Sequence, residues 1–300
     1  MLVLGAGASK PFGFPSGREL VDIVTGGLQD PGGTDLGKFL ISCGFKSEDL
    51  RQFSHNLVYS QRNSVDAFLE YRPEFTAVGK AAIVSVLIQR EDPKNLFIDG
   101  DWYRYLFQML NTSFEDFEKN TIAIITFNYD RSLEFYLVRA LKAAYGRSVD
   151  ECVAKVASIP IIHLHGKMGE IFSVGEKFRD YAPTLNPEAM QLSSEQIKIV
   201  HEDIGSEPEF AKAHERIFRA ETLCFLGFGY DRTNIKRLFP EKLFPNMRLL
   251  YELRIFGSAQ GLTHAEVDNV KNIIGHFGKI DLDAVGYGCL EYLRENRVLF

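Results

Sequence analysis

Cysteine is scarce in this chain, and its few cysteines lie far apart. The 300 residues contain four of them, none close enough to another to form a paired motif: Cys43, Cys152, Cys224 and Cys289. This spacing provides neither the paired ligands of a zinc ribbon nor the dense framework of a disulfide-rich secreted domain. We therefore expect a reduced, cytoplasmic protein that folds without disulfides and holds no metal ion.

The chain also lacks a long apolar run and a strong charge of either sign. No stretch approaches the roughly 20 apolar residues that span a bilayer, and the N-terminus has no basic flank or cleavage site of a signal peptide. The net charge is -6, which gives no general attraction to the phosphates of nucleic acids. We expect a soluble protein with no membrane partner.

Apolar residues, by contrast, are plentiful and occur in an alternating pattern. They make up 45% of the chain, enough for a substantial core. Runs typical of buried strands recur, with helical patterns between them, at 2–4, 121–126, 159–165, 221–228 and 248–257. This alternation predicts an α/β fold with a Rossmann-like parallel sheet that helices cover on both faces.

Residues 47–115 depart from the alternation, because they carry helical spacing without a convincing strand. We interpret them as a mostly helical insertion, or small subdomain, in a single domain that spans residues 1–300. Val65, Phe68 and Leu69 are expected as buried contacts of its first helix, in ordinary core packing.

A glycine-rich stretch, LVLGAGASKPFGFPSG, begins with the first apolar run. Gly5, Ala6 and Gly7 carry little or no side chain where the chain leaves the strand, so a ligand can approach the backbone closely. Free N–H groups and a helix N-terminus supply partial positive charge for phosphate oxygens at such a turn. The stretch therefore indicates dinucleotide binding, although a glycine turn can also serve only to reverse the chain.

Polar residues follow the second strand, at the end where open α/β sheets bind ligands. The sequence there is ITFNYDRSLE, and Asn128 and Asp130 are the candidate ligand contacts. Either side chain is also suited to cap the helix that begins near Arg131. Both roles stay open, since one residue can cap the helix while the other faces the ligand.

Two histidines lie at the end of the third strand, in IIHLHGKMG. Period-two alternation places His163 and His165 on the same side, but only His165, nearer the carboxyl end, should reach the ligand crevice. Histidine exchanges a proton at neutral pH, and Gly166 leaves room for a ligand. We predict that His165 is catalytic and that His163 is a hydrogen-bonded core residue.

Small residues recur at the ends of two later strands. Gly227 and Gly229 follow one strand, in FLGFGYDRTN, and Gly257 and Ser258 follow the other. Because the carboxyl ends of parallel strands meet at one edge of the sheet, we expect these residues to converge on the same crevice. Thr263 is placed to cap the helix that comes next.

Together these stretches resemble the sirtuin-like superfamily, and specifically its NAD-hydrolysing (NADase) branch in bacterial anti-phage defence systems. The resemblance spans nearly the whole chain and rests on GAGASKPFGFP, TFNYDRSLE, HLHG and FLGFGYDRTN in that order, with SVDAFLEYR, DWYRYL and GLTHAE as accessory segments. The four zinc-binding cysteines of protein-deacylating sirtuins are missing, and Phe127 stands where those enzymes have Gln. These departures put deacylation in doubt.

The resemblance implies NAD as a substrate and no metal. It implies that Asn128 and His165 are catalytic and that Asp130 holds the nicotinamide side. The residues that it places on the cofactor are Gly5, Ala6, Gly7, Ser9, Gly13, Pro15, Gly227, Gly229 and Tyr230, with Asp231 as a weaker match. Gly257 and Ser258 are added as cofactor contacts on their position alone.

The implied reaction is hydrolysis of the bond between nicotinamide and ribose, which yields ADP-ribose and depletes NAD⁺ as a defence. Because unregulated hydrolysis would be toxic, we expect a homo-oligomer, a separate activating subunit such as an ATPase or nucleic-acid-guided protein, or a phage-derived trigger. The first strand begins one residue after Met1, which also suggests an N-terminal truncation. Three alternatives stay open, namely a protein deacylase, a catalytically silent sensor of NAD or an ADP-ribose-type nucleotide, and an interaction subunit.

Overall fold

A single parallel sheet organises the protein. The computed structural model describes residues 1–110, 112–172, 177–199, 207–240, 253–275, 277–283, 286–296 and 299. The strands run in the order β3-β2-β1-β4-β5-β6, and every pair is parallel. They are β1 (Leu2–Leu4), β2 (Ile124–Thr126), β3 (Ile161–His163), β4 (Thr222–Leu226), β5 (Arg254–Ser258) and β6 (Lys279–Asp283). This doubly wound order confirms the predicted Rossmann-like α/β fold.

The order of the strands reverses at β1, which lies between β2 and β4. Val3 pairs in register with Ile125 on one side and with Phe225 on the other. At such a switch point the connections that follow the two central strands lead to opposite faces of the sheet, and a crevice opens between them. The turns after β1 and β4 therefore lie where a ligand is expected.

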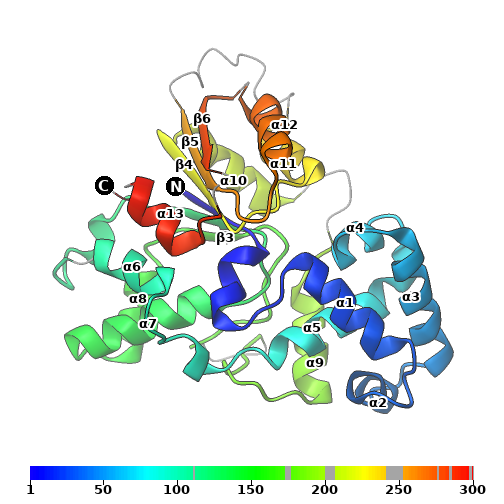
Figure 1. Cartoon of the computed structure of the whole chain (residues 1–300). Coiled ribbons are helices and arrows are strands. Elements are labelled where there is room, and N and C mark those ends of the chain that lie inside the picture. The colour runs from blue at the N-terminus through cyan, green and yellow to red at the C-terminus, as the bar shows by residue number, and fades with distance from the viewer. Residues whose placement is uncertain are drawn as a thin grey trace.

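Alternate residues of the strands pack into two separate cores. Leu2, Leu4 and Cys224 belong to the larger core, whereas Val3 and Phe225 belong to the smaller one. The smaller core is completed by α10 (Pro208–Phe218), α11 (Arg232–Leu238) and α12 (His264–Ile274). In Figure 1 these three helices lie beside β4–β6, away from the larger body of helices. Helices thus cover both faces of the sheet.

Among the described residues between β1 and β2, the chain forms only helices and turns. After the 3-10 turn η1 (Ala6–Phe12) come α1 (Gly17–Leu28), α2 (Asp35–Ser42), α3 (Ser47–Ser60), α4 (Val65–Leu69), α5 (Thr76–Ile88) and α6 (Trp102–Met109). Helix α5 is buried on nearly all sides, so it forms the centre of this layer. Val65, Phe68 and Leu69 are buried. The treatment of residues 47–115 as an insertion in one domain stays a prediction.

The remaining helices complete the larger core. They are α7 (Ser132–Tyr145), α8 (Val149–Val156), α9 (Pro187–Gln196) and α13 (Cys289–Asn296). Figure 1 shows α6–α8 on one side of the blue η1 segment and α1–α5 on the other. Thr263 caps α12 in a capping box with Glu266, as predicted. None of the described helices is both long and apolar enough to cross a membrane.

The sequence missed one strand, and part of another predicted run lies outside the described residues. Residues 248–252 of the predicted fifth run lie outside the described residues, and β5 starts at Arg254. Strand β6 was not predicted at all. Its sequence KIDLD alternates Ile280 and Leu282 with polar residues, a signal of a half-buried strand that is weak over five residues.

Candidate nucleotide-binding and catalytic site

The turns after β1 and β4 lie directly against each other. The Gly7 N–H donates to the Gly227 carbonyl at 2.9 Å, and the Gly5 N–H donates to the Leu226 carbonyl at 3.0 Å. A Cβ atom on Gly5 or Gly7 would lie 2.6 or 2.8 Å from the Gly227 oxygen. Gly227 has a φ of 56°, and a Cβ atom there would collide with the backbone of Ala8. These three glycines are therefore required where the two turns touch.

Gly227 and Gly229 offer a matched test of this contact. We expect Gly227→Ala to destabilise the protein by about 1–3 kcal/mol, because alanine is strained at positive φ and meets the first turn. At Gly229, no atom of the described residues lies within 4 Å of the place that a Cβ atom would take, so Gly229→Ala should change stability by less than about 0.5 kcal/mol. Denaturant unfolding measures both values, and equal stabilities would contradict the packing role of Gly227.

A pocket of about 660 Å³ opens beside the two turns. Its lining includes five of the predicted cofactor contacts, namely Ala6, Gly7, Gly227, Gly229 and Ser258. Lys10 is the only charged side chain among the described residues that line it. Ser16 and Gly17 also line the pocket and begin α1, whose N-terminal N–H groups carry partial positive charge. Small residues, one cation and a helix N-terminus suit a phosphate-bearing ligand.

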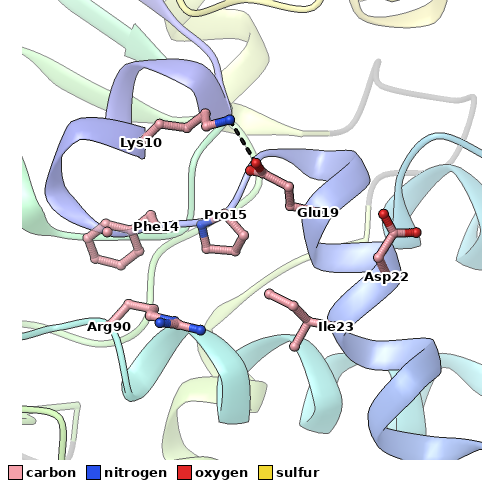
Figure 2. A pocket seen from close by; sticks show the side chains of 8 residues that line it. Lys10, Phe14, Pro15, Glu19, Asp22, Ile23 and Arg90 are labelled. Carbon is pink, nitrogen blue, oxygen red and sulfur yellow. Dashed lines mark hydrogen bonds and ion pairs between the residues drawn. The ribbon is translucent and has the colours of Figure 1, made fainter.

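Gly13 and Pro15 line a second pocket, of about 400 Å³. Figure 2 shows Lys10 and Glu19 on one side of it, joined by an ion pair of 2.8 Å, and Arg90 on the other. Lys10 lines both pockets, so its side chain lies where they adjoin. Gly13 and Pro15 thus lie near the first pocket, because Lys10 lines both pockets, but they are not part of the first pocket's lining.

Ser9 connects the glycine turn to the end of β2. The amide of Asn128 donates to the Gly5 carbonyl and to the Ser9 hydroxyl oxygen, both at 3.0 Å. The Ser9 hydroxyl in turn donates to Oδ2 of Asp130 at 2.8 Å. Oδ1 of Asp130 accepts the Ser132 N–H at 3.1 Å, which anchors the first turn of α7. The N-cap of α7 is Arg131, which makes no side-chain cap bond. Asp130 therefore binds the first residue of the helix without being its N-cap, while Asn128 faces the glycine turn.

Burial distinguishes Asp130 from an ordinary surface carboxylate. It raises the pKa of Asp130, and the hydrogen bonds from Ser132 and Ser9 only partly offset this effect. The group is 8% exposed. A carboxylate in this setting is held rigidly by two hydroxyls, which suits a positioning function better than proton transfer.

The two histidines have different environments. Nδ1 of His163 donates to the Asn128 carbonyl at 3.0 Å, and Nε2 lies 2.8 Å from the Glu134 carboxylate. Burial acts to lower the pKa of His163, but Glu134 outweighs it and the pKa is raised; the pKa of Glu134 is lowered to about 2, against the opposing effect of burial. His163 is therefore the hydrogen-bonded core residue that was predicted.

His165 is 5% exposed, and its Nε2 has no hydrogen-bond partner in the described part of the chain. Its ring centroid lies 5.7 Å from that of Phe127, which in turn lies 5.1 Å from that of Phe228. Phe228 lines the larger pocket, whereas neither His165 nor Asn128 does. A chain of aromatic contacts thus connects the imidazole to the pocket wall.

The later candidates form part of that wall. Ser258 Oγ accepts the Gly227 N–H at 3.0 Å, and the Ser258 carbonyl accepts the hydroxyl of buried Tyr230 at 3.0 Å. Gly257 leaves space for the Tyr230 hydroxyl, which a Cβ atom would meet. Asp231 caps α11. Tyr230, Gly257 and Asp231 do not line the pocket, and their contact with a nucleotide stays a prediction.

A protein-family model matches part of the chain. Residues 122–244 match the SIR2-like domain. The SIR2-like segment runs from β2 to α11 and contains Asn128, Asp130 and His165, while the glycine turn after β1 precedes it. The match supports the sirtuin-like part of the resemblance and links the chain to NAD-related chemistry. No curated protein and no solved structure gives a significant match.

Two polar residues beside the site were not among the predicted contacts. Lys10 lies inside the glycine-rich stretch, where a cation could have been noticed as a phosphate ligand. Asp66 lies in α4, and its carboxylate is 3.9 Å from Nδ1 of His165. No local pattern connects Asp66 with His165, because 99 positions separate them in the sequence. No three His, Cys, Asp or Glu side chains gather as metal ligands within the described residues.

Proposed function

We propose that this protein is an NAD⁺ glycohydrolase, which cleaves the nicotinamide–ribose bond to give nicotinamide and ADP-ribose. The observation that carries the proposal is the contact of Asn128, from the SIR2-like segment, with the glycine turn beside a pocket at the sheet's switch point. The pocket volume of about 660 Å³ lies within the range of about 300–1,000 Å³ that is usual for small-molecule sites.

The residues present suit the reaction. The bond from C1′ of the ribose to nitrogen breaks, and nicotinamide leaves as a neutral ring with the electron pair while positive charge develops on the sugar. A water oxygen then bonds to C1′, and its proton passes to His165 as general base. Both amide hydrogens of Asn128 are used by Gly5 and Ser9, so its side-chain oxygen is left to orient a ribose hydroxyl or the water. Asp130 would orient the carboxamide.

We further propose that the catalytic site becomes accessible only when Phe127 or Phe228 moves. Neither His165 nor Asn128 lines the pocket in this structure, and the two phenylalanines connect His165 to its wall. Such restraint fits an effector whose uncontrolled activity would be toxic. Oligomer assembly, a separate activating subunit such as an ATPase or nucleic-acid-guided protein, or a phage-derived trigger would cause the movement, in anti-phage defence by NAD⁺ depletion.

A catalytically silent nucleotide sensor is the second candidate, favoured by the absence of Asn128 and His165 from the pocket lining. Incubation of the purified chain with NAD⁺, alone and with candidate partners, separates the possibilities. Chromatography should show nicotinamide and ADP-ribose in equal amounts for a hydrolase. NAD⁺ that is bound but never cleaved would identify a sensor, and cleavage only with an acyl-lysine peptide would identify a deacylase.

Lys10 permits a test of how the pocket holds phosphate. Its ammonium group is half-exposed and lies 2.8 Å from Glu19, so it can exchange this partner for a phosphate oxygen. We expect Lys10→Gln to weaken the binding of ADP-ribose about tenfold, because a charged hydrogen bond is lost. Isothermal titration should show unchanged binding of adenosine, which has no phosphate.

Arg90→Gln is the matched control for Lys10→Gln. Arg90 lines only the second pocket, so its loss should leave ADP-ribose binding unchanged. An equal loss of adenosine and ADP-ribose binding in Lys10→Gln would refute a phosphate contact at this side chain.

A further inference from the structure

Helix α4 brings a carboxylate from outside the SIR2-like segment to the predicted catalytic histidine. Oδ1 of Asp66 lies 3.9 Å from Nδ1 of His165, within ion-pair range and longer than a hydrogen bond. The side chains of Asp66 and His165 are only 20% and 6% exposed. Where so little water is present, a carboxylate and an imidazole interact more strongly than they would at the surface.

Neighbouring contacts hold Asp66 at this place. Ser64 caps α4 by accepting the Ala67 N–H at 3.1 Å, and the hydroxyl of Tyr129 donates to Oδ1 of Asp66. Burial acts to raise the pKa of Asp66, but His165 and Tyr129 lower it below its usual value. The Asp66 carboxylate is therefore charged near neutral pH and has two partners in the SIR2-like segment.

The other end of α4 is also fixed to that segment. Glu70 forms an ion pair of 2.9 Å with Arg237 of α11, and the two side chains are 7% and 5% exposed. On the opposite side, the carbonyl of His165 accepts the Lys198 N–H at 2.7 Å. Both the helix that carries Asp66 and the backbone that carries His165 are thus held in place, which makes their approach a fixed feature.

We propose that Asp66 is a positioning residue for His165. Its negative charge favours the ring orientation and the tautomer in which Nδ1 carries the proton, which leaves Nε2 as the bare nitrogen. A neutral imidazole has one N–H and one bare nitrogen, and the partner of one decides the state of the other. Nε2 of this buried ring has no hydrogen-bond partner among the described residues. That Nε2 takes the proton of the attacking water rests on the proposed function, whereas the orientation of the ring does not.

Long-range ¹H–¹⁵N NMR spectra test the orientation without any turnover. At a pH where the imidazoles are neutral, His165 of the wild-type protein should carry its proton on Nδ1. In Asp66→Ala the proton should shift to Nε2, while the signals of His163 stay unchanged. Asp49→Ala, an exposed aspartate in the first turn of α3, is the matched control. The same His165 tautomer in wild type and Asp66→Ala would overturn the proposal.

A second variant protects this test against a folding defect. Asp66→Asn keeps the size of the side chain and loses its charge, so it should weaken the preference for the Nδ1-protonated form. If wild type cleaves NAD⁺, Asp66→Ala should lower kcat about 10²-fold with KM nearly unchanged, which is the cost of misplacing a catalytic group by about 1 Å. Asp66→Glu should recover part of this loss.

The two proposals fail in different ways. If wild type binds NAD⁺ without cleaving it under any condition, the proposed function fails and the tautomer measurement alone decides on Asp66. If wild type is active and Asp66→Ala retains its kcat and its Nδ1-protonated His165, the positioning function of Asp66 fails and the hydrolase proposal stands.

Discussion

Replacing His165 with alanine should stop NAD⁺ cleavage and leave the fold intact. Loss of a general base costs about 10²- to 10⁴-fold in rate. Nε2 of His165 has no hydrogen-bond partner in the described part of the chain, so its removal breaks no hydrogen bond there. Asp66 loses the nearby imidazole but keeps the hydroxyl of Tyr129 as a partner. Nicotinamide release measures the rate, and thermal unfolding measures the fold. A variant with the wild-type rate would contradict the assignment of His165.

Asn128→Ala should have the same effect for a different reason. The substitution removes the side-chain oxygen that would orient the ribose or the water, together with the bonds to Gly5 and Ser9. We expect loss of cleavage with retained folding. His55→Ala, at an exposed histidine of α3, is the control and should cleave NAD⁺ at the wild-type rate. Full activity of Asn128→Ala would remove this residue from the mechanism.

The largest expected effect on stability follows from Glu91→Ala. Glu91 lies just after α5 and is fully buried; its carboxylate accepts from Nε of Arg131 at 2.9 Å and pairs with Arg179. Without Glu91, two largely buried guanidinium groups would lose their counter-charge. Breaking such a buried pair costs about 3–5 kcal/mol, because the remaining charge is left uncompensated.

Glu115→Ala is the matched control for Glu91→Ala. Glu115 forms an ion pair of 2.7 Å with Arg147, but the two side chains are 68% and 44% exposed. Surface pairs contribute at most about 1 kcal/mol. Urea unfolding of both variants should therefore give a much larger loss of unfolding free energy for Glu91→Ala. Equal losses would show that the buried cluster does not stabilise the contact between α5 and the start of α7.

Local patterns in the sequence were sufficient for most of the sheet. Strands of a parallel sheet are buried on both faces, so they read as continuous apolar runs that stand out from the helices between them. The runs that contain β1 to β4 are of this kind. Strand β6 has only Ile280 and Leu282 as apolar residues, and five alternating positions at the edge of a sheet are too short a signal to be distinguished from a loop.

The same local patterns identified the ends of the strands but not what each small residue contacts. Gly5 and Gly7 were expected to make room for a ligand, whereas the structure shows that they also make room for Gly227. Likewise, Tyr230 fills the space over Gly257 and donates to Ser258. Such contacts join turns that are far apart in the chain, so they depend on how the strands are ordered in the sheet.

The sequence by itself determined the α/β class, the carboxyl ends of the strands as the candidate site, and the place of His163 as a hydrogen-bonded core residue. Only the tertiary structure decided that Asp66 faces His165 and that Phe127 and Phe228 connect His165 to the pocket wall. The physical reason is that strand and helix periodicities act over a few residues, whereas these contacts arise from the packing of separate elements, which no local spacing encodes.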